Sequence, residues 1–115
     1  MVSPGFYSIT CYQGATFNKT FTWTIDETPF NLTGYTARMQ VRPTKESSTT
    51  ILSLTSSSGI SLGGALGTIA LNVTATATAA LAAGVYVYDL ELVSGTGAVT
   101  RLLEGKFIVS AEVSR

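Results

Sequence analysis

The sequence predicts an all-β fold, an antiparallel two-sheet sandwich of the immunoglobulin-like or jelly-roll-like kind. Two observations predict it. Several short stretches alternate apolar and polar residues with a period of two, which is typical of strands with one buried face. Turn residues separate these stretches at intervals of roughly 8 to 12 residues, as in sandwich proteins. At 115 residues, the chain is expected to form one domain over residues 1–115, with short docking tails at its two ends.

The first long strand is expected from Thr16 to Ile25. Its apolar side comprises Phe17, Phe21, Trp23 and Ile25, and its polar side comprises Asn18, Thr20, Thr22 and Thr24. Turn residues follow in the sequence DETPFNLTG. The next strand is YTARMQVR, in which Tyr35, Ala37, Met39 and Val41 face inward and Arg38, Gln40 and Arg42 face outward. Pro43 ends this strand because proline has no amide hydrogen to donate to a neighbour.

The second half of the chain continues the pattern. Strands are expected at ILSLT, residues 51–55, and at TIALNVT, residues 68–74. One short helix is expected near residues 76–83, because that stretch is rich in alanine and is followed by a glycine. Leu81 is expected to fill the end of the core. The stretch GVYVYDLELV is the next strand, and AVTRLLEG and KFIVSAEV are expected to form a closing pair.

The stretch GVYVYDLELV contains two acids, Asp89 and Glu91, on one face of the strand. The opposite face carries Tyr86, Tyr88, Leu90 and Leu92, which must be the buried one. The acids are therefore expected on the solvent side, where little burial is available to raise a carboxylate pKa. We expect a solvated face and no acid/base pair. A salt bridge from these acids to a partner subunit, through Arg38, Arg42 or Arg101, is an alternative.

Composition excludes several kinds of function. The formal net charge is 0 and 12% of the residues are charged, so no basic stripe is present and nucleic acid is not expected as a partner. The chain has no histidine, which is the commonest general base and metal ligand. We therefore expect no enzyme, no catalytic residue, no metal, no cofactor and no small-molecule substrate. Its longest alanine-rich stretch is too short to cross a bilayer, so no membrane is expected.

The N-terminal sequence MVSPGFYSIT lacks the features of a secretory signal and is expected to be a mature end. Cys11 is the only cysteine, so no intrachain disulfide can form, and this side chain is expected in the core. The candidate docking residues are the aromatic residues of the opening segment and three arginines: Phe6, Tyr7, Tyr12, Arg38, Arg42 and Arg101.

Two stretches carry a resemblance to a known family. They are QGATFNKTFTWTIDETPFNLTGYTARMQVRP and GVYVYDLELVSGTGAVTRLLEGKFIVSAEV. Both resemble small β-sandwich domains of tailed bacteriophages, namely the N-terminal domain of the baseplate upper protein and of tail-fibre attachment proteins. The matching residues are strand and turn residues, and the resemblance covers nearly the whole chain.

The resemblance implies a virion structural protein. It would be an attachment or adaptor module in the tail, baseplate or fibre region, made in the bacterial host cytoplasm and located in the phage particle. Its partners would be other phage virion proteins, with many copies in a symmetric assembly. Two alternatives stay open: a capsid decoration (cement) protein, and a carbohydrate-binding or adhesion module. Tyr7 and Tyr12 are the aromatic residues that a sugar would contact.

Overall fold

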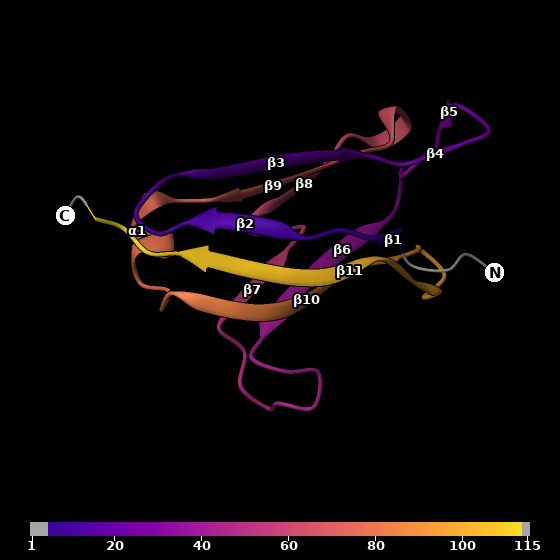
Figure 1. Ribbon diagram of the computed structural model, residues 1–115. Coiled ribbons are helices and arrows are strands. Elements are labelled where there is room, and N and C mark those ends of the chain that lie inside the picture. The colour runs from indigo at the N-terminus through magenta and orange to yellow at the C-terminus, as the bar shows by residue number, and fades with distance from the viewer. Residues whose placement is uncertain (1–4, 114–115) are drawn as a thin grey trace.

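The computed structural model describes residues 5–113, which form two β-sheets packed face to face (Figure 1). The strands are β1 (Gly5–Phe6), β2 (Ile9–Tyr12), β3 (Phe17–Thr22), β4 (Thr24–Ile25), β5 (Thr28–Pro29), β6 (Thr36–Arg42), β7 (Leu52–Thr55), β8 (Ile60–Leu62), β9 (Thr68–Val73), β10 (Gly84–Val93) and β11 (Val99–Ser110). A 3-10 turn η1 (Gly64–Leu66) and one short helix α1 (Ala75–Ala79) complete the elements.

The larger sheet has the order β1-β11-β10-β6-β7, with β2 also paired to β11, and the smaller sheet has the order β3-β9-β8. The short strands β4 and β5 form a separate hairpin. Strands β3, β9 and β8 opposite β11, β10, β6 and β7 give the order of an immunoglobulin-like sandwich with one added edge strand. The predicted two-sheet sandwich is confirmed. Its pairing is not wholly antiparallel, because β1 and β2 both run parallel to β11.

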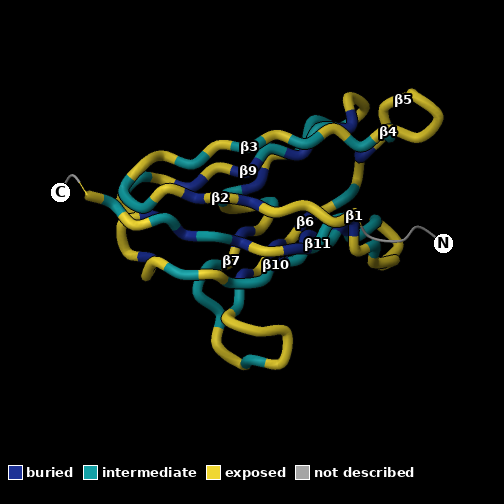
Figure 2. The backbone as a smooth tube through the Cα atoms, viewed as in Figure 1, coloured by how far each residue is buried: buried dark blue, intermediate teal, exposed yellow. Residues whose placement is uncertain are grey.

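Alternation places the core as the sequence predicts. In β6 the residues Ala37, Met39 and Val41 are buried and the intervening residues are more exposed, and β9 buries Ile69, Leu71 and Val73. Cys11 is fully buried, as expected, and burial raises the pKa of its thiol. Figure 2 shows buried segments along the strands between the two sheets and exposed segments in the connecting loops.

Several predicted boundaries are wrong. The first long strand ends at Thr22, and Ile25 is 47% exposed, because the chain turns back through a hairpin in which Asp26 and Glu27 have positive φ. The expected closing pair is one continuous strand, β11, which bends through a bulge opposite Leu90 and Glu91 instead of turning.

The helix also begins at Ala75, before the expected range of 76–83, because Thr74 caps its first turn by accepting a hydrogen bond from the Ala77 N–H, and it ends at Ala79. Leu81 is buried at the end of the core, as predicted. Of the expected docking tails, residues 1–4 and 114–115 lie outside the described residues. Gly5 belongs to β1 and Ser110 ends β11, so these parts of the tails are strand.

Three residues position the N-terminal segment against β11, namely Tyr88, Glu104 and Gly105. The Tyr7 amide donates to the Glu104 carbonyl at 3.0 Å, and the Tyr7 carbonyl accepts from the Tyr88 hydroxyl at 2.7 Å. Burial, the main cause, raises the pKa of Tyr88 well above its usual range, so the hydroxyl keeps the proton it donates. Gly105 lies opposite Tyr88, and a Cβ there would overlap the Tyr7 carbonyl. Only glycine lets the two backbones approach this closely.

The turn between β2 and β3 is held by α1. The Thr78 hydroxyl donates to the Ala15 carbonyl at 2.8 Å and accepts from the Gly14 amide at 3.1 Å. Thr78 is fully buried, and its hydroxyl satisfies two main-chain groups that the turn leaves without partners. At the start of β10, the Tyr86 hydroxyl donates to the Ala82 carbonyl at 2.7 Å, the short-range bond of a tyrosine corner.

Replacing Gly105 by alanine tests the contact with the N-terminal segment. Gly105→Ala is expected to lower the free energy of unfolding by about 1–3 kcal/mol, because the added methyl group must displace the Tyr7 backbone. Urea denaturation followed by tryptophan fluorescence measures the change. The matched control is Gly95→Ala, where the new Cβ meets only ordinary van der Waals contact. An equal effect at both positions would contradict the role given to Gly105.

Candidate docking face and edge groove

The outer face of the larger sheet is the first candidate site, and we call it the docking face. Because opposite residues in paired strands share a face, register defines it as three rows across β6, β10 and β11. The first row is Arg42, Val87 and Lys106. The second row is Gln40, Asp89 and Glu104, and the third is Arg38, Glu91 and Arg101. The first row is cationic, the second is anionic, and the third is mixed.

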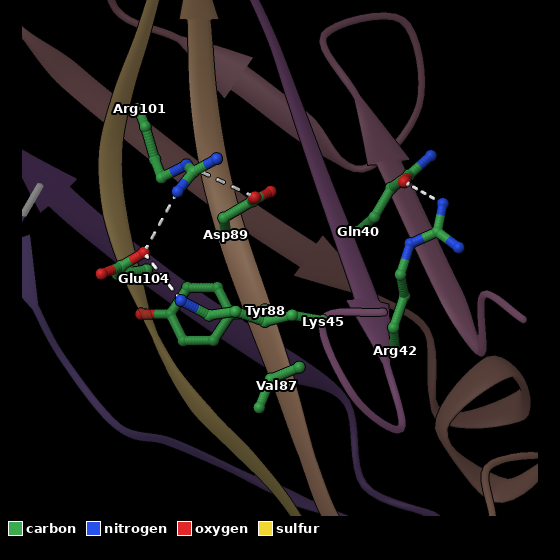
Figure 3. A pocket seen from close by; sticks show the side chains of 8 residues that line it. All are labelled: Gln40, Arg42, Lys45, Val87, Tyr88, Asp89, Arg101 and Glu104. Carbon is green, nitrogen blue, oxygen red and sulfur yellow. Dashed lines mark hydrogen bonds and ion pairs between the residues drawn. The ribbon is translucent and has the colours of Figure 1, made fainter. Parts of the chain in front are cut away.

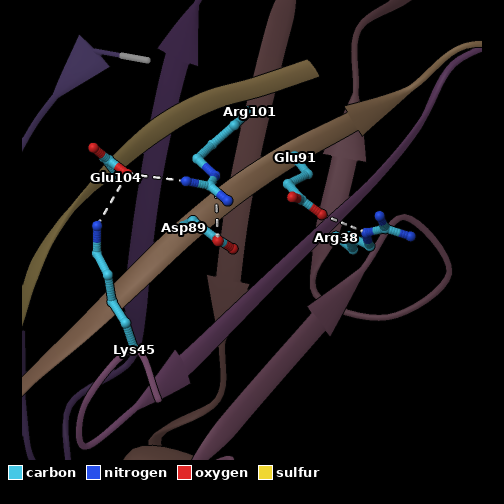
Figure 4. Close-up of polar contacts among 6 residues, drawn as sticks. All are labelled: Arg38, Lys45, Asp89, Glu91, Arg101 and Glu104. Carbon is cyan, nitrogen blue, oxygen red and sulfur yellow. Dashed lines mark hydrogen bonds and ion pairs between the residues drawn. The ribbon is translucent and has the colours of Figure 1, made fainter. Parts of the chain in front are cut away.

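Ion pairs connect these rows (Figure 4). Arg38 Nε lies 2.7 Å from Glu91 Oε1, and Arg101 Nε lies 3.6 Å from Asp89 Oδ2. Glu104 lies 3.5 Å from Arg101 Nη1 and 3.6 Å from Lys45 Nζ. Lys45 comes from the loop after β6, so this loop is drawn toward the face. Asp89 and Glu91, for which a salt bridge to a partner subunit was the alternative, thus form ion pairs within the chain.

A shallow hollow of about 160 Å³ lies in the docking face. Figure 3 shows its lining, with Gln40 and Arg42 on the β6 side and Arg101, Asp89 and Glu104 toward β11. Arg42 donates to the Gln40 side chain at 2.8 Å and to the Ser47 carbonyl at 2.9 Å, which anchors the loop. Three cations therefore surround the hollow: Arg42, Lys45 and Arg101.

The acids are less exposed than the sequence predicts. The side chains of Asp89 and Glu91 are 39% and 20% exposed, because arginine side chains lie across them. Desolvation, the largest cause, raises the pKa of Asp89, and the Glu91 charge acts in the same direction, while Arg101 partly opposes both. Asp89 therefore sits in a half-buried, ion-paired position. Tyr88, Leu90 and Leu92 are buried on the other face, as expected.

A second hollow, the edge groove, lies between β2 and β3 on one side of the sandwich. It has a volume of about 390 Å³ and is lined by residues 7–10, Tyr12 and residues 15–19. The Lys19 ammonium lies 5.1 Å from the centre of the Tyr7 ring and 5.7 Å from that of Phe21. Tyr7 also packs edge-on against Phe21 at 5.4 Å. Because the Tyr7 ring already has these two neighbours, the geometry does not favour it as a sugar platform.

The structure separates the six predicted docking residues into two groups. Phe6 and Tyr12 have the outward register on the larger sheet and are 75% and 63% exposed, and Arg38, Arg42 and Arg101 also lie on the docking face. Tyr7 instead lies in the edge groove, which Tyr12 also lines from the end of β2. Sequence reasoning missed Val85, which is 63% exposed, and Lys106. The alternation in GVYVYDLELV already placed Val85 on the face of the acids.

Residues 5–113 bring no three side chains of His, Cys, Asp or Glu close enough together to hold a metal ion. No helix in this range is long and apolar enough to cross a membrane.

No family model and no curated protein matches the chain. Among the solved structures that resemble it are two from studies of sodium channel beta subunits. One belongs to a study of parallel homodimers of the extracellular domains of the voltage-gated sodium channel beta4 subunit, which explain its role in cell–cell adhesion; it is 13% identical, has a TM-score of 0.39 and covers 98% of each chain. The other concerns multimeric cell-adhesive interactions of the channel beta subunits, with 12% identity, a TM-score of 0.39, and 99% of this chain and 98% of that chain covered.

The comparisons contradict the function predicted from the sequence. The two solved structures described above come from studies of cell adhesion, and neither is part of a phage particle. The interpretation as a virion protein of the tail, baseplate or fibre region, with its capsid-decoration variant, is therefore wrong. The resemblance to baseplate domains is not tested and stays a prediction. The likeness to the adhesion domains concerns the sandwich architecture alone.

The raised pKa of Asp89 predicts an unusual pH dependence. The folded-state pKa lies above the unfolded value of about 3.9, so the folded state holds the proton more tightly. The stabilisation that this tighter proton binding by Asp89 gives is fully present below the unfolded pKa and is lost as the pH rises through the folded pKa. Asp89→Asn is therefore expected to raise the free energy of unfolding by less than about 1 kcal/mol near pH 7, and to equal the wild type near pH 3.

Chemical denaturation at both pH values measures this difference. Glu91→Gln serves as the control, because it weakens the 2.7 Å contact with Arg38 and is expected to give no gain near pH 7. An Asp89→Asn variant that is less stable than the wild type near pH 7 would show that the Arg101 pair outweighs desolvation.

Proposed function

We propose that this chain is a non-enzymatic adhesion module that binds a second copy of itself through the docking face. The observation that carries the proposal is the order of charges on that face. A row with Arg42 and Lys106 lies next to a row with Asp89 and Glu104, one strand repeat of about 6.6 Å away. Alternating rows of opposite sign are the pattern that a self-complementary contact requires.

The geometry of the contact follows from symmetry. A two-fold axis that lies in the interface and crosses β10 near Tyr88 inverts the order of the rows. It places Lys106 of one copy over Glu104 of the other, and Glu104 of the first over Lys106 of the second. Arg42 then faces the Gln40 side chain of the other copy. Exposed apolar residues, Phe6, Tyr12 and Val85, lie around this charged centre and add burial.

Charge reversal gives a direct test in a bead-clustering assay. Beads coated with Lys106→Glu or with Glu104→Lys are each expected to cluster on the order of tenfold less than wild-type beads, because like charges meet twice across the axis. Mixing the two kinds of bead is expected to restore clustering, since Glu at position 106 then meets Lys at position 104.

The control carries added charge on the other sheet. Asn72→Glu with Ser61→Glu adds two negative charges to exposed positions of the smaller sheet and is expected to leave clustering unchanged. Thermal melts check that every variant folds. Absence of clustering by the wild type, or loss in both reversals without recovery on mixing, would remove the proposal.

A further inference from the structure

The free edge of β3 is a second interaction surface. Strand β3 is bonded to β9 on one side, and no strand of the described part of the chain pairs with its other side. It has six residues, while the other outer strands β1, β2, β7 and β8 have two, four, four and three. A long unpaired strand edge is a template for another strand.

The hydrogen bonds of the smaller sheet show which main-chain groups this edge presents. The Gly63 amide bonds to the Thr68 carbonyl, and the Asn72 amide bonds to the Gly59 carbonyl, so residues 68, 70 and 72 of β9 face β8. The odd residues of β9 therefore bond to their register partners Phe17, Lys19 and Phe21. The main-chain N–H and C=O groups of Asn18, Thr20 and Thr22 point to the free edge.

Side-chain burial also indicates that the outer side of β3 is not covered by another strand of the described chain. Phe17, Lys19 and Phe21 face the interior but are only half-buried, whereas Ile69, Leu71 and Val73 on the neighbouring strand are buried. The edge groove lies beside these half-buried residues. An added strand would cover them, because its own inward side chains would lie over the groove.

We propose that the occupant is β3 of a second copy, paired antiparallel about a two-fold axis at Thr20. In this register Asn18 pairs with Thr22 of the other copy and Thr20 pairs with Thr20. Asn18, Thr20 and Thr22, whose main-chain groups point to the free edge, then all form hydrogen-bonded pairs. Their polar side chains lie opposite polar side chains on the outer face.

The inner face of this register is also complementary. Lys19 lies opposite Phe21 of the other copy, so each ammonium meets an aromatic ring, as it already does within the chain at 5.7 Å. The two Lys19 residues are diagonal neighbours, not opposite ones. A register shifted by one pair would place Lys19 directly opposite Lys19, which is unfavourable. The Lys19 charge therefore disfavours that shifted register and is compatible with the two-fold axis at Thr20.

The edge dimer would form one continuous six-stranded sheet from the two smaller sheets. Its two-fold axis is perpendicular to that sheet, so both larger sheets lie on the same side and both docking faces point in one direction. This consequence rests on the proposed function, while the dimer itself does not. Two faces presented together would strengthen a weak face-to-face contact through avidity.

Sedimentation velocity over a concentration series tests the edge dimer. The wild type is expected to form dimers, and Thr20→Pro and Thr20→Lys are each expected to weaken dimerisation at least about tenfold. Proline removes an amide that has no partner within the chain, and lysine places two like charges at the axis. Ser61→Lys, on the outer strand at the opposite side of the same sheet, is expected to dimerise like the wild type.

Cysteine cross-linking tests the register. Thr20→Cys is expected to form a covalent dimer under mild oxidation, because Cα atoms of a hydrogen-bonded pair lie about 5.5 Å apart, within disulfide range. Asn18→Cys is expected not to, because its symmetry mate lies roughly 13 Å away along the strand. Cys11 is fully buried and does not compete.

A monomeric wild type, a dimer unaffected by Thr20→Pro, or cross-linking at position 18 in place of position 20 would overturn the proposal. Lys106→Glu separates it from the proposed function. That variant is expected to keep the edge dimer and lose bead clustering, so loss of its dimer would show that the docking face, not the edge, joins the copies.

Discussion

The hydrogen bond from the Tyr88 hydroxyl to the Tyr7 carbonyl decides where the N-terminal segment lies. It can form only because Gly105 leaves room for the Tyr7 backbone beside β11. With this segment bound to β11, strands β1 and β2 extend the larger sheet by parallel pairing. The smaller sheet keeps three strands, and the outer edge of β3 stays open. The attachment of this segment to β11, which the part-buried contact between Tyr88 and Tyr7 supports, therefore determines both the size of the docking face and the existence of the free edge.

The two candidate surfaces follow different physical rules. The docking face is an array of side-chain charges whose pairs are half-exposed, so each pair by itself contributes little to stability. Their order in rows is what gives the face specificity for a matching surface. The free edge of β3 offers main-chain groups, whose pairing is directional and independent of side-chain identity. Lys19 adds specificity there by disfavouring the register that would place it opposite its own copy, whereas an aromatic ring opposite it is favourable.

The half-buried carboxylates show why residue alternation predicted the docking face only in part. Alternation correctly placed Asp89 and Glu91 on the side away from the core. Burial of those acids depends on the arginines that cross-strand register brings beside them, and Arg101 is aligned with Glu91 only because β11 bulges between Arg101 and Leu103. The same register forms the rows with Lys106 and Glu104. No local pattern in GVYVYDLELV contains that information.

The sequence by itself determined the all-β class, the inward residues of β6, β9 and β10, the burial of Cys11 and Leu81, and five of the residues that lie on the docking face. These follow from period-two alternation, which is a local property of each strand. Only the tertiary structure decided the parallel pairing of β1 and β2, the single bent strand β11 and the hairpin that exposes Ile25. It also decided which edge is left without a partner. These features depend on which distant strands pair and on how closely two backbones can approach, and neither is encoded in the spacing of neighbouring residues.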